Sequence, residues 1–315
     1  MRKLILFLCL LFFFPLTGFA KAPKVLISQV VRHPALDRTT QGIIDTLREA
    51  IKAQELTVRV ESAQGNPALA AQIASKFIDQ SPDVVVGVGT LSAQSFERYA
   101  RQGKVKLVFS SVTDPQSAGL LEPAMRPYVT GVSNFVELKP QLELFQKLQP
   151  RLRRLGVLYN PGELNSVSIV HKLEKLVPTL GMTLVKQTAT QTADVAQAAA
   201  KLANGADAIF ISNDNTALTA LGSIIKAARH TKIPVYVSDT DDVALGALAA
   251  LGPNQYELGR QTGRLIVQIL KGKQIADMPV EFPRKSDFYF NTPVAHFLGL
   301  PLPTNMRPDK VIPTP

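Results

Sequence analysis

The stretch Val84–Gln94, "VVVGVGTLSAQ", changes from a continuous apolar run to small and polar residues within a few positions. Its first part, Val84–Val88, has the β-branched composition of a strand that is buried on both faces. Gly87 and Gly89 permit a tight turn, and a helical pattern over residues 91–101 follows. A buried strand followed closely by a helix is the repeating unit of a parallel α/β sheet, so this stretch indicates the fold class.

The same alternation fills most of the 315 residues. A first series has predicted strands over residues 24–30, 55–61, 84–88 and 105–110, with helices over 36–53, 66–80 and 91–101. After a strand over 128–135 and a helix over 137–148, a second series has strands over 154–159, 183–186, 208–212 and 235–238, with helices over 163–180, 192–203 and 216–230. This length exceeds one ordinary hydrophobic core. We therefore predict an α/β protein of two doubly wound, parallel-sheet lobes.

The tail predicts that the chain returns to both lobes. A short strand over 246–251, a helix over 254–270 and strands over 280–282 and 287–291 are too few for an independent unit. We expect residues 21–134 to form the N-terminal lobe and 135–243 the C-terminal lobe. Residues 244–274 are expected to return to the N-terminal lobe, and 275–315 to the C-terminal lobe and a tail.

Residues 1–20 have the order of a cleaved signal peptide: basic Arg2 and Lys3, an apolar run, and small residues before a cut after Ala20. The apolar run of about 11 residues is shorter than the ~20 needed to cross a bilayer, so a retained membrane anchor is the less favoured alternative. Cys9, the only cysteine, lies inside this run. We therefore expect a periplasmic mature chain without disulfide, reactive thiol or lipid anchor.

The basic charge does not predict binding to nucleic acid. Loss of Arg2 and Lys3 lowers the formal net charge from +10 to +8. The tightest basic cluster is Arg151, Arg153 and Arg154, without interleaved aromatic residues. A solvated surface explains these charges better than a basic face for a membrane or partner.

Polar side chains follow the apolar strands of both series. Because ligands bind beyond the carboxyl ends of the strands in open parallel sheets, these side chains are the candidate binding residues. They lie in six stretches: Arg32 and His33; Gly89–Gln94, with Thr90 and Ser92; Ser110–Asp114, with Ser111 and Thr113; Tyr159–Ser166, with Asn160 and Asn165; Ser212–Thr216, with Asp214 and Asn215; and Ser238–Asp242, with Asp239.

The two lobes offer different chemistry. Thr90–Ala93 at a helix start, with Ser111 and Thr113, suits a small carboxylate; the alternative is an ordinary helix cap. Asp214 or Asp239 in the other lobe suits an ammonium group. Asp114 is a further acceptor, or only the turn before Pro115. An anion-binding lobe that faces a cation-binding lobe predicts a zwitterion such as an amino acid.

Catalytic and cofactor motifs are not recognisable. Ser92 occupies the third glycine position of a dinucleotide fingerprint, and Ser111 is not in a G-x-S-x-G elbow. The four histidines provide no evident base. The acidic residues lack the spacing of a calcium loop, and no histidine pair has zinc-ligand spacing. We predict no enzyme, no catalytic residue, no metal and no cofactor; a secreted hydrolase is the weaker alternative.

Several motifs together resemble the ABC-transporter substrate-binding protein family whose characterised members handle tryptophan or tyrosine. The similarity extends from about Lys24 to Pro303. Its motifs are "HPALD" (33–37), "VTDPQSAGL" (112–120), "VTGVSN" (129–134), "VLYNPGELNSV" (157–167), "NDNTA" (213–217), "KIPVYVSDTDDVALGALAALG" (232–252) and "LGRQTG" (258–263). Each motif alone is a weak signal, whereas their combination is specific.

The resemblance implies a type I periplasmic-binding-protein fold, in which two α/β lobes joined by three crossovers close on a ligand. By matching position it implies a pocket from Thr90, Ser92, Ala93, Ser111, Thr113, Asp114, Asn134, Tyr159, Asn160, Asn165, Asp214, Asn215, Ser238 and Asp239. The partners implied are a small-molecule ligand and an ABC permease of the inner membrane, with the protein as a monomer.

The chain departs from the family pattern in two places. Arg32 replaces a frequent acidic residue beside His33, and Pro253, Asn254 and Gln255 stand where two bulky residues are common. Arg32 follows a strand at the cleft side, so it bears on the ligand more than on the fold. The alternatives to an amino-acid carrier are a sensor that signals to a membrane receptor, and a binding protein for a purine, nucleoside or sugar.

Overall fold

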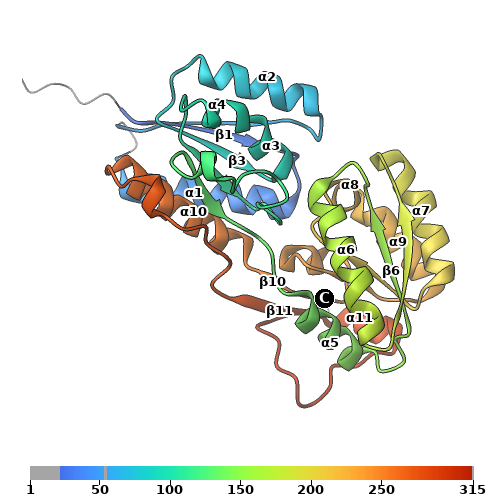
Figure 1. Ribbon diagram of the computed structural model, residues 1–315. Helices are drawn as coiled ribbons and strands as arrows, with labels where there is room; N and C mark the ends of the chain where they lie inside the picture. The colour runs from blue at the N-terminus through green and yellow to red at the C-terminus, as the bar shows by residue number, and fades with distance from the viewer. Residues whose placement is uncertain (1–21, 53–54, 314–315) are drawn as a thin grey trace, which may run out of the picture.

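The computed structural model describes residues 22–52 and 55–313 and shows two α/β lobes side by side (Figure 1). The predicted signal peptide and its cleavage site lie outside these residues. None of the helices in the described part of the chain has the length and hydrophobicity of a membrane span.

The first lobe contains a five-stranded parallel sheet in the order β2-β1-β3-β4-β5. Its strands are β1 (Lys24–Gln29), β2 (Thr57–Ser62), β3 (Val84–Val88), β4 (Leu107–Ser110) and β5 (Val129–Val132). Its helices are α1 (Pro34–Ala50), α2 (Pro67–Ile78), α3 (Thr90–Ser95), α4 (Glu97–Arg101), η2 (Pro123–Met125), α10 (Gln255–Leu270) and η4 (Ile275–Asp277). Val25 and Ile27 of β1 enter the hydrophobic core on one face of the sheet, and Leu26 enters the core on the other. Both faces are therefore covered.

The second lobe contains a seven-stranded sheet in the order β12-β11-β10-β9-β8-β6-β7, in which only the β10–β11 pair is antiparallel. Its strands are β6 (Arg154–Tyr159), β7 (Thr183–Thr188), β8 (Ala208–Ile211), β9 (Val235–Val237), β10 (Ala249–Pro253), β11 (Ser286–Asn291) and β12 (Lys310–Ile312). Its helices are α5 (Leu138–Leu148), α6 (Leu164–Thr179), α7 (Thr192–Gly205), α8 (Asn215–Thr219), α9 (Leu221–Thr231), η3 (Thr240–Leu245) and α11 (Thr292–Leu298). The prediction of two doubly wound lobes is confirmed.

Three local predictions were wrong. The helix expected over 91–101 is divided at Phe96, which is fully buried and stacks on Phe77 with ring centroids 6.3 Å apart. The helix expected over 216–230 is divided at Ala220. Residues 280–282 form no strand and contribute a single bridge between Glu281 and Val132.

The assignment of residues 244–274 to the first lobe needs correction. β10 pairs with β9 and β11, so it belongs to the second sheet, and only α10 returns to the first lobe. Ile275 and Met278 then stay in the core of the first lobe, which moves the last crossing beyond Glu281. The chain thus crosses between lobes after β5, after β10 and before β11 (Figure 1). A short apolar strand carries no local signal of which sheet it joins, which is why the pattern misplaced β10.

Helices α1 and α10 approach each other backbone to backbone. A Cβ atom on Gly42 would lie 2.2 Å from the carbonyl oxygen of Tyr256, and one on Gly259 would lie 2.0 Å from that of Thr39. Only glycine fits at such a contact. This close approach brings Thr39 of α1 next to Gln255, the first residue of α10.

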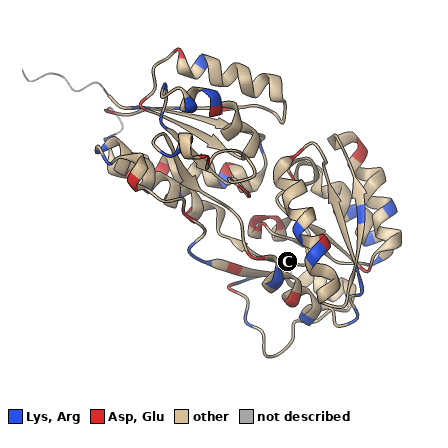
Figure 2. Ribbon diagram, in the orientation of Figure 1, with Lys and Arg blue, Asp and Glu red and all other residues tan. Residues whose placement is uncertain are grey.

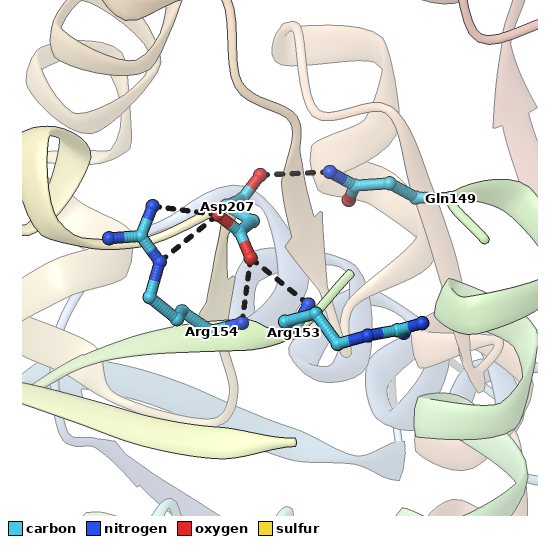
Figure 3. Close-up of polar contacts among 4 residues, drawn as sticks. All are labelled: Gln149, Arg153, Arg154 and Asp207. Carbon is cyan, nitrogen blue, oxygen red and sulfur yellow. Dashed lines mark hydrogen bonds and ion pairs between the residues drawn. The ribbon is translucent and has the colours of Figure 1, made fainter. Parts of the chain in front are cut away.

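The basic cluster at the start of β6 has a structural role. Asp207 accepts hydrogen bonds from the backbone N–H groups of Arg153 and Arg154 at 3.0 and 2.8 Å, and from the Arg154 guanidinium at 2.8 Å; its own carbonyl oxygen accepts from Gln149 (Figure 3). Burial would raise the pKa of Asp207, but these hydrogen bonds outweigh burial and lower it. Elsewhere Lys and Arg are interspersed with Asp and Glu over both lobes (Figure 2).

Candidate functional site

A buried cavity lies between the lobes, at the carboxyl ends of the strands. Its walls come from the loops after β1, β3, β4, β5, β8 and β9 and from the starts of α1, α6, α8 and α10. The lining residues are His33, Ala35, Leu36, Gly89, Thr90, Ser111, Thr113, Asn134, Asn165, Asn213, Asn215, Leu218, Asp239 and Gln255. The volume of this cavity is about 310 Å³, including its open mouth.

Asp239 is the carboxylate of this cavity. Its side chain is 3% exposed, and burial together with the negative charge of Asp241 raises its pKa to about 7, against the opposing hydrogen bond from Gln255. Gln255 donates to Oδ1, and no residue in the described part of the chain bonds Oδ2. One carboxylate oxygen is thus held in place, and the other remains for a ligand.

A chain of buried hydrogen bonds connects Asp239 to the first lobe. The Gln255 side chain that donates to Asp239 also accepts from the Thr39 hydroxyl at 3.0 Å. The Thr39 and Ser111 hydroxyls lie 3.4 Å apart. Ser111 has φ +55°, a left-handed conformation that is uncommon for a residue other than glycine, and it lines the cavity. Residues of the first lobe therefore hold the Asp239 carboxylate of the second lobe in position.

The two lobes are also joined directly across the cleft. The Ser168 hydroxyl of the second lobe donates to Asp114 Oδ2 of the first at 2.6 Å, and the Asn213 amide donates to the Thr113 hydroxyl at 3.2 Å. Asp114 also accepts from the backbone N–H and the hydroxyl of Ser117. Burial would raise the pKa of Asp114, but these hydrogen bonds and the charge of Lys172 lower it. Asp114 thus forms its turn and an interlobe contact, and does not line the cavity.

Replacing Ser168 by alanine is expected to weaken ligand affinity about three- to tenfold. The Ser168–Asp114 hydrogen bond joins the lobes, so its loss removes stabilisation from the closed state without touching the ligand. Isothermal titration calorimetry of this variant measures the effect. Ser223→Ala, at an exposed position of α9, serves as the control and should bind as the unaltered protein does. Equal affinity of both variants would contradict a role for this contact in closure.

Asp214 does not line the cavity either. It caps α8, accepting hydrogen bonds from the backbone N–H groups of Ala217 at 2.7 Å and Asn160 at 2.6 Å, and from the Ser166 hydroxyl at 2.5 Å. Burial and the charge of Glu163 raise its pKa to about 7. The expected contact of Asp214 with an ammonium group does not fit this saturated position, so Asp239 is the remaining acid at the cavity.

The other predicted residues divide in the same way. Besides Asp239, the cavity lining includes Thr90, Ser111, Thr113, Asn134, Asn165 and Asn215. Apart from Asp114 and Asp214, the remaining predicted residues lie outside the cavity because their side chains point into a lobe. In the first lobe, Ser92 accepts a hydrogen bond from Ser28, and Ala93 packs on Gly87. In the second lobe, Ser238 donates to Gln141, Asn160 donates to Thr216, and Tyr159 packs on the hydrophobic core.

Three polar lining residues were not among those predicted to form the pocket. His33 and Asn213 were noted only as polar residues that follow strands, and Gln255 only as part of a departure from the family pattern. Arg32, the neighbour of His33, has a side chain 77% exposed and does not line the cavity. The substitution at Arg32 therefore does not alter the binding surface.

Two polar groups at the cavity have no partner among the residues that the structure describes. They are the Thr90 hydroxyl, on a residue 3% exposed, and both ring nitrogens of His33, on a residue 6% exposed. Buried polar groups are normally hydrogen-bonded, so unused ones that line a cavity are candidates for contact with a ligand. Within residues 22–52 and 55–313, no group of three His, Cys, Asp or Glu side chains is placed to hold a metal ion.

Comparison with known proteins agrees with this geometry. The model of the family described as ABC transporter substrate binding protein matches residues 24–310. A "Tyrosine-binding protein" from Clostridioides difficile is 29% identical over 87% of this chain and 80% of its own length.

Two solved structures bear on the arrangement of the lobes. An ABC domain from Streptococcus pneumonia in complex with L-Trp is 29% identical, covers 92% of this chain and 99% of its own, and superimposes with a TM-score of 0.87. The ligand-free, open structure of a substrate-binding protein from Clostridium difficile is 30% identical and covers 93% of this chain and 100% of its own. It superimposes with a lower TM-score of 0.70. Identity and coverage are nearly the same for the two structures, so the higher TM-score favours a lobe arrangement like that of the tryptophan complex. The fold, the interlobe cavity and the match over residues 24–310 together show that this chain belongs to the ABC transporter substrate-binding protein family.

Proposed function

We propose that this protein captures an α-amino acid between its lobes and delivers it to an ABC permease of the inner membrane. The observation that carries the proposal is Asp239, a buried carboxylate with one free oxygen in a cavity between two lobes. A ligand that contacts both lobes favours the closed state, and a permease then recognises that state.

The charge of the cavity supports a ligand with an ammonium group. Among its lining residues, which all belong to the described chain, Asp239 is the acid and neither Lys nor Arg occurs. A buried carboxylate is stabilised by a cation within hydrogen-bond distance, which an α-ammonium group supplies. The ligand's own carboxylate then relies on neutral donors, for which Thr90, with its unused hydroxyl, Ser111 and Asn213 are the candidates.

The apolar residues that line the cavity favour a ligand with an aromatic side chain. Ala35, Leu36 and Leu218 are buried apolar residues of the cavity. One relative is named for binding tyrosine, and one solved structure holds L-Trp. Both amino acids combine a flat apolar body with one polar group. Such a ligand suits a cavity that is apolar on part of its wall and hydrogen-bonding on the rest.

The protein is proposed to bind its ligand without converting it. Within the described chain, neither the Ser111 hydroxyl nor the Thr113 hydroxyl is hydrogen-bonded to a histidine that could act as a base. We further propose that residues 1–20 direct export of the chain to the periplasm and that the protein acts as a monomer. A sensor that passes closure to a membrane receptor would use the same site.

A thermal-shift and calorimetry panel tests the proposal. L-tyrosine, L-tryptophan and L-phenylalanine are compared with 3-(4-hydroxyphenyl)propionate, which lacks the ammonium group, and with glucose and adenosine. At a ligand concentration about 100 times the dissociation constant, binding adds roughly 2.7 kcal/mol of stability and raises the melting temperature. At least one aromatic amino acid should stabilise the protein, and the analogue without an ammonium group should not. Stabilisation by glucose or adenosine alone would refute the proposed ligand class.

A further inference from the structure

His33 lies at the cavity with both ring nitrogens unused. It is the N-cap residue of α1, yet its side chain makes no capping hydrogen bond. The residue is 6% exposed, and within the described chain no partner bonds Nδ1 or Nε2. A histidine that only filled the core would leave two desolvated polar atoms unpaired, at a cost that native structures avoid.

The surroundings of His33 favour its neutral ring, because burial lowers its pKa. The Asn215 side chain lies near the ring but without the geometry of a hydrogen bond; it and the negative charges of Asp37 and Glu163 oppose the effect of burial without outweighing it. A neutral imidazole carries one N–H donor and one acceptor nitrogen. It therefore pairs with a group such as a hydroxyl, whichever way that hydroxyl is oriented.

The position of His33 separates it from the acidic end of the cavity. Thr39, which bonds Gln255 and through it Asp239, lies six residues further along α1. At about 1.5 Å per helical residue, the backbones of His33 and Thr39 lie roughly 9 Å apart along the axis of α1. A ligand held by its ammonium group at Asp239 needs a long side chain to reach His33.

We propose that His33 bonds a hydroxyl group at the far end of the ligand's side chain, and so selects a phenolic amino acid over its deoxy analogue. This proposal rests on the proposed function. It identifies the part of the same site that contacts the end of the ligand's side chain. A site built to bond a hydroxyl discriminates strongly against an analogue that lacks it, because its own buried group is then left unpaired.

The experiment compares L-tyrosine with L-phenylalanine by isothermal titration calorimetry. The unaltered protein should bind L-tyrosine at least about tenfold more tightly than L-phenylalanine. His33→Phe should weaken binding of L-tyrosine about tenfold and leave that of L-phenylalanine within about threefold, which removes the preference. His33→Gln, which keeps a hydrogen-bond donor and an acceptor, should retain part of the preference for L-tyrosine. Arg32→Ala is the matched control, because the Arg32 side chain points into solvent, and it should change neither affinity.

Each contrary result has a distinct meaning. Equal affinity of the unaltered protein for both amino acids would overturn the role of His33, and so would an equal loss for both in His33→Phe and His33→Gln. Failure of every amino acid to bind, with clear binding of glucose or adenosine, would overturn the proposed function and this proposal with it. Melting curves of the variants, measured without ligand, distinguish loss of folding from loss of recognition.

Discussion

Replacing Asp239 by asparagine is expected to weaken amino-acid binding about a hundredfold, which corresponds to roughly 2.7 kcal/mol. Asparagine keeps the size of the side chain and a carbonyl oxygen, but it removes the negative charge that faces the ligand's ammonium group. Hydrogen bonds between buried charged groups contribute roughly 1.5–3 kcal/mol each, and truncating one partner costs more. Isothermal titration calorimetry at pH 8, where Asp239 is largely ionised, measures the loss.

Asp242→Asn is the matched control for this substitution. Asp242 is 2% exposed, lies three residues further along the chain and does not line the cavity. Burial, with the negative charges of Asp239 and Asp241, raises its pKa to about 8. Its neutralisation removes one buried charge without removing a ligand contact, so affinity should stay within about threefold. An equal loss in both variants would show that Asp239 acts through the general charge of this region.

The pH dependence of binding should follow the same carboxylate. Because burial raises the pKa of Asp239 to about 7, the group is protonated below that pH and no longer attracts an ammonium group. Affinity is therefore expected to fall as the pH decreases from 8 to 5, by up to about tenfold per pH unit well below 7. Asp239→Asn should show a much flatter profile, and an equally steep profile in that variant would assign the titration to another group.

The stability of the unliganded protein should change in the opposite direction. The pKa of Asp239 is raised on folding from its usual value of 3.8, so its contribution to stability is fully present below about 4 and is lost as the pH rises through 7. Ligand binding offsets this loss by supplying the missing cation. The thermal shift caused by the ligand should thus be larger at pH 8 than at pH 5.

Gly259→Ala is expected to destabilise the protein by about 2–3 kcal/mol. The new Cβ atom would lie 2.0 Å from the backbone carbonyl oxygen of Thr39, so α1 and α10 would have to separate. This strain exceeds the gain of about 1 kcal/mol in helix propensity that alanine brings. Urea unfolding of the unliganded protein measures the change.

A control variant and a binding measurement test the physical basis of this prediction. Gly222→Ala in α9 has open space around the new atom and should be neutral or stabilising by up to about 1 kcal/mol. Gly259→Ala should also weaken ligand binding, because α1 carries Thr39 and α10 carries Gln255, and their hydrogen bond positions Asp239. Equal stabilities of the two glycine variants would contradict the tight helix contact.

The local pattern of the chain determined the fold class and the region of the site. Buried strands such as Val84–Val88 alternate with helices, and this periodicity depends only on neighbours in sequence. Because parallel strands place their carboxyl ends at one edge, residues after them, such as Thr90, Ser111 and Asp239, were expected near one another, and they line one cavity.

The tertiary structure alone decided which of these side chains face the cavity. Asp214 and Asp239 both follow an apolar strand, but Asp214 caps α8 while Asp239 lines the cavity. Thr39 and Gln255 are 216 residues apart in sequence, and their contact depends on the packing of α10 against α1. Such pairings arise from long-range packing and burial, for which the periodicity of a single segment carries no signal. The fold was therefore evident in the sequence. The acid that faces the ligand, the place of β10 in the second sheet and the unused nitrogens of His33 were decided by the folded chain.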